Sequence, residues 1–202
     1  MTNIVVGFDL DMTLIDSRPG VIASFSALNR ELGTDIDGPL IASRLGPTLE
    51  SEMAAYFAAD EIAAVCDRYR AHYAELGPPG CSLLPGAAEA VAAVRTQSGT
   101  TLVVTAKFEP NARLCLDHVG IGIDHVVGWR HGPQKAETLQ QYDADVYVGD
   151  TQPDIEAARV AGVHAVGVAS GPVDRAGLAA AGADIVFDSL LEFPAWLRDF
   201  CA

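Results

Sequence analysis

The sequence predicts an α/β protein, with a doubly wound parallel sheet of the Rossmann-like kind and a small inserted all-α cap domain. Short apolar runs alternate with helical patterns over most of the chain. One early stretch interrupts this alternation, because it contains helical patterns only. Several apolar runs end directly before acidic or hydroxyl residues, which is where parallel sheets bind their ligands.

Six segments are expected to form strands, because each is a short apolar run bounded by turn residues. They lie at about 3–8, 101–105, 124–127, 145–149, 164–168 and 184–187. Helices are expected between them at about 85–97, 110–119, 134–142, 153–161 and 173–181. The fourth has Pro153 in its first turn and Gly162 just past its end, a matched start and stop. Such alternation is typical of a parallel sheet covered on both faces.

The early stretch contains helical patterns at about 20–32, 48–57 and 60–76, with a turn-rich segment at 33–39. Gly77-Pro78-Pro79-Gly80 closes it. We therefore assign residues 17–80 to a helical cap. Residues 1–16 and 81–202 form the α/β core, which carries the candidate catalytic residues. The cap is expected to cover the strand ends.

The composition is that of a folded globular protein, with 202 residues, 50% hydrophobic and 20% charged. The formal net charge of -14 argues against nucleic acid or an anionic membrane as the main partner. The chain start lacks the pattern of a signal peptide, and no segment approaches membrane-spanning length. We expect a cytoplasmic protein with four reduced cysteines. The sequence does not indicate an oligomeric state.

Carboxylates follow two of the predicted strands. Asp9 and Asp11 come after the first apolar run, and Asp150 and Asp154 come after the run at 146–148. Unpaired anions held close together at buried strand ends are costly. A divalent cation that takes oxygen ligands removes that cost. The pattern therefore predicts a magnesium site and phosphoryl transfer.

Four segments, in order, carry a resemblance to a known family. The run at 9–14, Asp-Leu-Asp-Met-Thr-Leu, resembles the first motif of the haloacid dehalogenase-like hydrolase superfamily. Val103-Val104-Thr105, then Lys135, then Val148-Gly149-Asp150 with Asp154 resemble the other three motifs. The helical insert is similar to the cap of the branch that includes phosphoglycolate phosphatases and β-phosphoglucomutases. The resemblance spans nearly the whole chain.

This resemblance implies a Mg²⁺-dependent phosphatase that hydrolyses a small phosphomonoester, phosphoglycolate-like or a sugar phosphate, through an aspartyl-phosphate intermediate. Asp9 would be the nucleophile. Asp11 would protonate the leaving group and later accept a proton from water. Thr105 would donate its hydroxyl to a phosphoryl oxygen, and Lys135 would offset the negative charge.

The same resemblance implies that Asp9, Asp150 and the backbone carbonyl of Asp11 bind the metal, with Asp154 in a supporting role. The expected substrate-binding residues are Thr13, Arg18, Arg44, Ala106 and Lys107. Lys107 and Lys135 are the only lysines among thirteen basic residues. An ammonium group is compact enough to serve both a carboxylate and a phosphate, so their positions favour a phosphate site.

Met12 stands where most phosphatases of the family carry glycine. We therefore expect either an ordinary φ at Met12 or a side chain that projects toward the cap and narrows the pocket. Trp129 and Trp196 are expected to pack. Two alternatives stay open: a phosphomutase of the β-phosphoglucomutase type, which needs the same core, and a non-catalytic phosphate-binding regulator. A dehalogenase is disfavoured, because it needs neither Asp11 nor a metal.

Overall fold

The computed structural model describes residues 3–202 and contains a six-stranded parallel sheet. The sheet order is β5-β4-β1-β6-β7-β8, so the strand order reverses beside β1. The strands are β1 (Val5–Phe8), β4 (Thr100–Val104), β5 (His125–Val127), β6 (Val146–Gly149), β7 (His164–Val168) and β8 (Ile185–Phe187). All six segments predicted to be strands are present, and the predicted fold class is confirmed.

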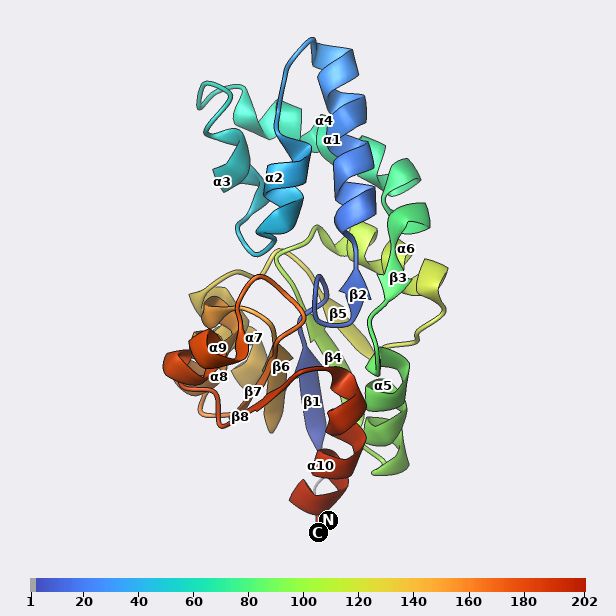
Figure 1. Cartoon of the computed structure of the whole chain (residues 1–202), viewed down its shortest axis with the longest axis vertical. Helices are drawn as coiled ribbons and strands as arrows, with labels where there is room; N and C mark the ends of the chain where they lie inside the picture. The colour runs from blue at the N-terminus through green and yellow to red at the C-terminus, as the bar shows by residue number, and fades with distance from the viewer. Residues whose placement is uncertain (1–2) are drawn as a thin grey trace.

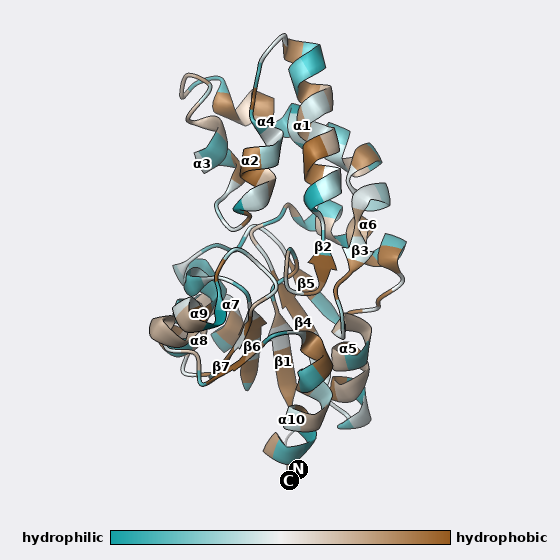
Figure 2. Ribbon diagram, in the orientation of Figure 1, coloured by the Kyte–Doolittle hydropathy of each residue, from teal (hydrophilic) through white to brown (hydrophobic). Residues whose placement is uncertain are grey.

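Helices cover both faces of the sheet (Figure 1). One face carries α5 (Ala87–Thr96), α6 (Glu109–Val119) and α10 (Phe193–Phe200); the other carries α7 (Pro133–Gln141), α8 (Gln152–Ala161) and α9 (Arg175–Ala181). Strand side chains alternate between the two layers: Val146 and Val148 join the first core, and Tyr147 joins the second. The strands are accordingly apolar, while the surrounding helices carry hydrophilic residues (Figure 2).

The inserted segment folds into α1 (Arg18–Leu32), α2 (Gly38–Ser43), α3 (Leu49–Met53) and α4 (Ile62–Leu76), which gather beyond one end of the sheet (Figure 1). Phe25 of α1 packs on Tyr69 of α4, with ring centroids 4.4 Å apart. Helix α2 was not predicted, because Gly38-Pro39 resembles a turn. Asp37 starts it by accepting a hydrogen bond from the Leu40 amide. That residues 17–80 form a separate domain stays a prediction.

The two segments that connect the sheet to these helices lie side by side. Strands β2 (Ile15–Asp16) and β3 (Ser82–Leu83) pair antiparallel there, next to the short helix η1 (Pro78–Gly80). A Cβ atom on Gly80 would lie 2.4 Å from the Gly20 nitrogen, so only glycine permits this close approach. Two-residue strands are too short for a periodic signal, so the sequence did not predict them. Among residues 3–202, no helix has both the length and the apolar character to cross a membrane.

Candidate active site

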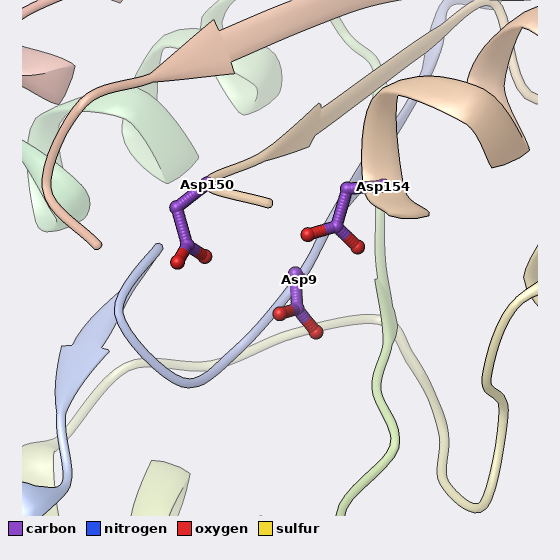
Figure 3. Close-up of side chains that lie close together, drawn as sticks. All are labelled: Asp9, Asp150 and Asp154. Carbon is purple, nitrogen blue, oxygen red and sulfur yellow. The ribbon is translucent and has the colours of Figure 1, made fainter. Parts of the chain in front are cut away.

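Three polar residues follow neighbouring strands and meet at one edge of the sheet. Asp9 comes after β1, Thr105 after β4 and Asp150 after β6, and β1 pairs with both of the other strands. Figure 3 shows the carboxylates of Asp9, Asp150 and Asp154 gathered around a common space. One oxygen of each lies within 4.8 Å of the others. The predicted convergence of these strand ends is therefore present in the fold.

Lys135, in the first turn of α7, joins two of these carboxylates. Its Nζ atom lies 2.6 Å from Asp154 Oδ1 and 3.0 Å from Asp9 Oδ1. Burial alone would lower the pKa of Lys135, but the carboxylates of Asp154 and Asp9 outweigh it and raise that pKa well above its usual value. Lys135 is therefore a buried cation.

Asp154 is held rigidly by its neighbours. Its Oδ2 atom accepts hydrogen bonds from the Thr151 amide (3.1 Å) and the Thr151 hydroxyl (2.5 Å), which form a capping box at the start of α8. Its Oδ1 atom accepts from Lys135 and, at 3.3 Å, from the Tyr147 hydroxyl. With both oxygens engaged, Asp154 is suited to the supporting role predicted for it.

Asp9 and Asp150 each have an oxygen without a hydrogen-bond partner, although both residues are buried. The 3.0 Å ion pair between Lys135 and Asp9 Oδ1 lacks hydrogen-bond direction, so it does not satisfy that oxygen. Asp150 Oδ1 accepts from the Thr13 hydroxyl at 2.6 Å, and its Oδ2 stays unpaired. A Cβ atom on Gly171 would lie 1.8 Å from that Oδ2, so Gly171 makes room for the carboxylate.

Burial makes these two carboxylates hard to ionise. It raises the pKa of Asp9 from 3.8 to about 7, with Lys135 opposing the rise and Asp154 and Asp11 adding to it. Burial, followed by the charges of Asp154 and Asp9, raises the pKa of Asp150 well above its usual value. Buried carboxylate oxygens without partners are ligands of the kind that a hard divalent cation takes. The residues present therefore fit Mg²⁺.

Asp11 lies on the side of the pocket nearer the inserted helices and is paired with Lys107. The Lys107 ammonium lies 2.9 Å from Asp11 Oδ1 and 4.4 Å from the ring centroid of Tyr73. The Ser17 hydroxyl donates a hydrogen bond to the same Asp11 oxygen. Burial lowers the pKa of Lys107, but the charge and hydrogen bond of Asp11, together with the nearby thiols of Cys115 and Cys81, outweigh it and the net pKa is raised. Lys107, predicted to bind substrate, therefore also holds Asp11 in place.

A pocket of about 930 Å³, counted with its open mouth, lies over these residues. Seven of the residues predicted from the sequence line it: Asp9, Asp11, Thr105, Ala106, Lys107, Lys135 and Asp154. Thr13 and Asp150 are buried and are not among the lining residues. The structure thus places Thr13 where it orients Asp150 rather than where it faces the pocket.

The two arginines predicted to bind substrate lie elsewhere. Arg18 forms an ion pair with Asp16 (2.6 Å) and Arg44 forms one with Glu52 (2.6 Å). Both arginine side chains are about half exposed, and neither lines the pocket. The arginine that does line it is Arg70 of α4, which sequence reasoning missed.

Other lining residues were also missed: Tyr69, Tyr73, Phe108, Asn111, Trp129 and His131. The spacing of Tyr69 and Tyr73, four residues apart on one helix, places them on a common face and was an available signal. Trp129 packs on Phe108, with 4.8 Å between ring centroids, but 52% of its surface stays exposed. Trp196 packs against Phe193 at 5.4 Å between ring centroids.

Met12 has a left-handed backbone, with φ of 62°, so the prediction of an ordinary φ is wrong. Its side chain is only 3% exposed and does not line the pocket, so it does not narrow the pocket. The left-handed conformation costs roughly 1–2 kcal/mol for a non-glycine residue. Burying a methionine side chain contributes roughly 1.5–3 kcal/mol. Burial therefore offsets the strain, and glycine is not required.

Comparison with known proteins gives a consistent result. The family model described as haloacid dehalogenase-like hydrolase matches residues 6–168. The phosphoglycolate phosphatase of Rhodospirillum rubrum is 31% identical over 218 residues, covering 94% of this chain and 89% of that protein. The tyrosine-protein kinase PtkA of Mycobacterium tuberculosis is 30% identical over 181 residues. That match covers 83% of this chain but only 62% of PtkA.

Solved structures show the same fold. The haloacid dehalogenase-like family hydrolase of Streptococcus pneumoniae superposes with a TM-score of 0.81 at 26% identity, over 98% of this chain and 100% of that one. A chain described as a predicted phosphoglycolate phosphatase, from Haemophilus somnus, superposes with a TM-score of 0.79 at 20% identity, over 100% and 99% of the two chains. At 20% identity, the similarity to the Haemophilus somnus chain shows a shared fold only.

Proposed function

This chain belongs to the haloacid dehalogenase-like hydrolase family, and from that premise we propose that it is a Mg²⁺-dependent phosphatase acting on a small phosphomonoester. The observation that carries the proposal is that a buried oxygen on each of Asp9 and Asp150 lacks a hydrogen-bond partner, beside the buried ammonium of Lys135. A phosphoryl group in transfer spreads negative charge over its oxygens, so its site must supply positive charge in a fixed geometry.

Asp9 and Asp150, with the backbone carbonyl of Asp11, would hold the magnesium ion. When bound, the ion neutralises the charge of the phosphate and of the two carboxylates. Lys135 supplies the protein's own positive charge beside Asp9, and its link to Asp154 keeps it there. Thr105 lines the pocket at the end of β4, where its hydroxyl donates to a phosphoryl oxygen.

The reaction has two steps. The Asp9 carboxylate attacks phosphorus, the bond from phosphorus to the ester oxygen breaks, and Asp11 gives its proton to the departing oxygen. An aspartyl-phosphate remains on Asp9. Asp11 then takes a proton from a water molecule that attacks this phosphate, which releases inorganic phosphate and restores Asp9. The contacts of Asp11 with Lys107 and Ser17 hold it in position for both proton transfers.

Relatives support a small phosphorylated metabolite as the substrate, because one of them is named a phosphoglycolate phosphatase. Phosphoglycolate and sugar phosphates are therefore the first compounds to test. The protein would act in the cytoplasm, without nucleic acid or membrane as a partner.

Replacing Asp9 by Asn tests this proposal. We expect release of inorganic phosphate from a panel of phosphomonoesters to require Mg²⁺, and the D9N variant to lose about 10⁴-fold in kcat or more, because the nucleophile is gone. Circular dichroism should show an unchanged fold. Asp199→Asn, at an exposed carboxylate of α10, serves as the matched control. Phosphate release by D9N at the wild-type rate would refute the nucleophile, and phosphate transfer to a sugar without release would indicate a mutase.

A further inference from the structure

The loop after β5 places Trp129 at the pocket in a strained backbone conformation. Trp129 has a φ of 54°, a conformation that bulky side chains rarely adopt, and it is 52% exposed while lining the pocket. Backbone hydrogen bonds hold it there: its own amide donates to the Lys107 carbonyl at 3.0 Å, and the Arg130 amide donates to the Thr105 carbonyl at 2.9 Å. Strain that the surrounding structure maintains, on an exposed aromatic residue, indicates a functional position.

Trp129 is part of a stack that joins the core to α4. The Phe108 ring lies 4.8 Å from the Trp129 ring, measured between centroids. The Arg70 guanidinium carbon lies 5.2 Å from the Trp129 centroid and 5.5 Å from that of Phe108. The nitrogens of Arg70 are engaged by the carboxylates of Glu50 and Asp67. Arg70 is therefore held against both rings by its acids, and a carboxylate on the substrate would have to compete with both of them.

Each lysine and arginine that lines the pocket within residues 3–202 has a carboxylate partner. Arg70 pairs with Glu50, Lys107 with Asp11, and Lys135 with Asp9 and Asp154. Lys135 lies at the proposed phosphate site, and Lys107 is already paired with Asp11, so among the described residues no unpaired lysine or arginine is left on the side that receives the leaving group. That side carries the acids Glu50 and Glu52, and much of its remaining surface is apolar or aromatic, with the lining side chains Phe25, Ile41, Leu45, Leu49 and Tyr69.

We propose that Trp129, together with Phe108 and Arg70, binds the leaving group, and that the preferred substrates are phosphomonoesters whose leaving group carries an aromatic ring. This inference rests on the proposed phosphatase activity and narrows its substrate class. A ring in the leaving group stacks on the exposed Trp129 ring, beside Arg70 and the apolar side chains that line the pocket. A short carboxylic acid, such as glycolate, finds no lysine or arginine among the lining residues that lacks a carboxylate partner.

The test compares benzyl phosphate with cyclohexylmethyl phosphate, which has a saturated ring of similar size and a comparable alkoxide, and with 2-phosphoglycolate. We expect wild-type kcat/KM to be highest for benzyl phosphate. Trp129→Ala should lower kcat/KM for benzyl phosphate about tenfold, mainly through KM. The same variant should change the value for 2-phosphoglycolate less than about twofold, because only the ring contact is lost. Trp129→Phe should restore most of the benzyl phosphate activity. Phe200→Ala, which removes an exposed aromatic ring outside the pocket, is the matched control.

Two results would overturn the proposal. One is a higher wild-type kcat/KM for 2-phosphoglycolate than for benzyl phosphate. The other is an equal loss on all three substrates in Trp129→Ala, which would make Trp129 a contact between the core and α4 only. If no phosphomonoester is hydrolysed, the phosphatase proposal itself fails. The proposed binding of a ring at Trp129 is then tested by ligand binding. Benzylphosphonate should quench tryptophan fluorescence in the wild type and not in Trp129→Phe. Absence of quenching in the wild type would refute the ring-binding site.

Discussion

The two walls of the pocket are built in opposite ways. On the core wall, Asp9 and Lys135 are buried ionisable groups, with Asp150 buried behind them, and Asp9 and Asp150 each have an oxygen without a hydrogen-bond partner. On the wall formed by the inserted helices, Arg70 has its charge matched by acids, and the remaining surface is largely aromatic or aliphatic. The core wall is electrostatically unsatisfied, which suits it to the cation and the phosphate that we propose. The other wall is satisfied, so we propose that it selects by shape and stacking.

This difference has consequences for mutation. Because the core charges are buried and interdependent, removing one leaves another without compensation, which costs stability as well as turnover. Residues of the other wall are uncharged or already paired, so removing one of them leaves no buried charge without a partner. Changes there should alter KM and substrate preference more than folding.

Among these variants, replacement of Lys135 is expected to reduce stability the most. Lys135→Met would leave Asp9 and Asp154 facing each other without the cation between them, so the free energy of unfolding should fall by about 3 kcal/mol. Urea denaturation in the absence of magnesium measures this directly. Protonation of Asp9, whose pKa is already raised to about 7, limits the loss at low pH.

Lys107→Met is the matched control for Lys135→Met. The pair of Lys107 with Asp11 is less buried, with 11% and 15% of the two side chains exposed against 5% and 1% for Lys135 and Asp154, so its loss should cost less than the loss of Lys135. Equal destabilisation by both variants would contradict the view that the carboxylate pair of Asp9 and Asp154 depends on Lys135.

The response to magnesium should depend on pH. Burial raises the pKa of Asp9 from 3.8 to about 7, so between these values the folded protein keeps a proton that the unfolded chain has released. Stability of the metal-free protein therefore falls as pH rises through this window. Magnesium competes with that proton, so adding it should raise Tm by about 3 °C at pH 8 and by less at about pH 5. Differential scanning calorimetry with magnesium or with a chelator measures both shifts.

Asp150→Asn tests whether the magnesium-induced rise in Tm comes from binding at this site rather than from the titration of other groups. It removes a proposed ligand while leaving the exposed surface unchanged. The variant should lose the magnesium-induced shift. An undiminished shift in the variant, or equal shifts at both pH values in the wild type, would remove Asp9 and Asp150 from the metal site.

The smallest effects distinguish Arg70 from Arg18. Arg70→Ala should raise KM for the preferred substrate about tenfold with little change in kcat, because it removes part of the leaving-group surface. Arg18→Ala should change KM less than about twofold, because Arg18 pairs with Asp16 outside the pocket. Steady-state kinetics on both variants measure how KM changes when an arginine side chain is lost inside the pocket and outside it. An equal rise in KM would mean that Arg18 reaches the substrate.

Much of the fold could be predicted from sequence, because β-branched runs and proline or glycine boundaries are local signals. Strand β6 and helix α8, with Pro153 and Gly162 at its ends, are the clearest cases. Helix α10 was not predicted, although Phe193 and Leu197, four residues apart, are both buried. Strands β2 and β3 could not be predicted, because two-residue pairing depends on the arrangement of distant segments.

For the site, the residues that follow strands could be predicted and the residues from the inserted helices could not. Asp9, Thr105 and Asp150 come together because parallel strands end at the same edge of a sheet, which chain order already implies. Arg44 and Arg70 look equivalent in the sequence. The packing of α4 beside the pocket, and the pairing of Arg44 with Glu52, decide which of them lines it.

The sequence by itself therefore determined the architecture and the acidic residues of the core wall, because hydrophobic period and strand-end position are properties of a continuous segment. The tertiary structure alone decided that Lys107 holds Asp11, that Met12 is buried in a left-handed conformation, and that Trp129 stays exposed against Arg70. Each of these results from contacts between segments far apart in the chain, whose energies depend on the distance and burial that folding creates.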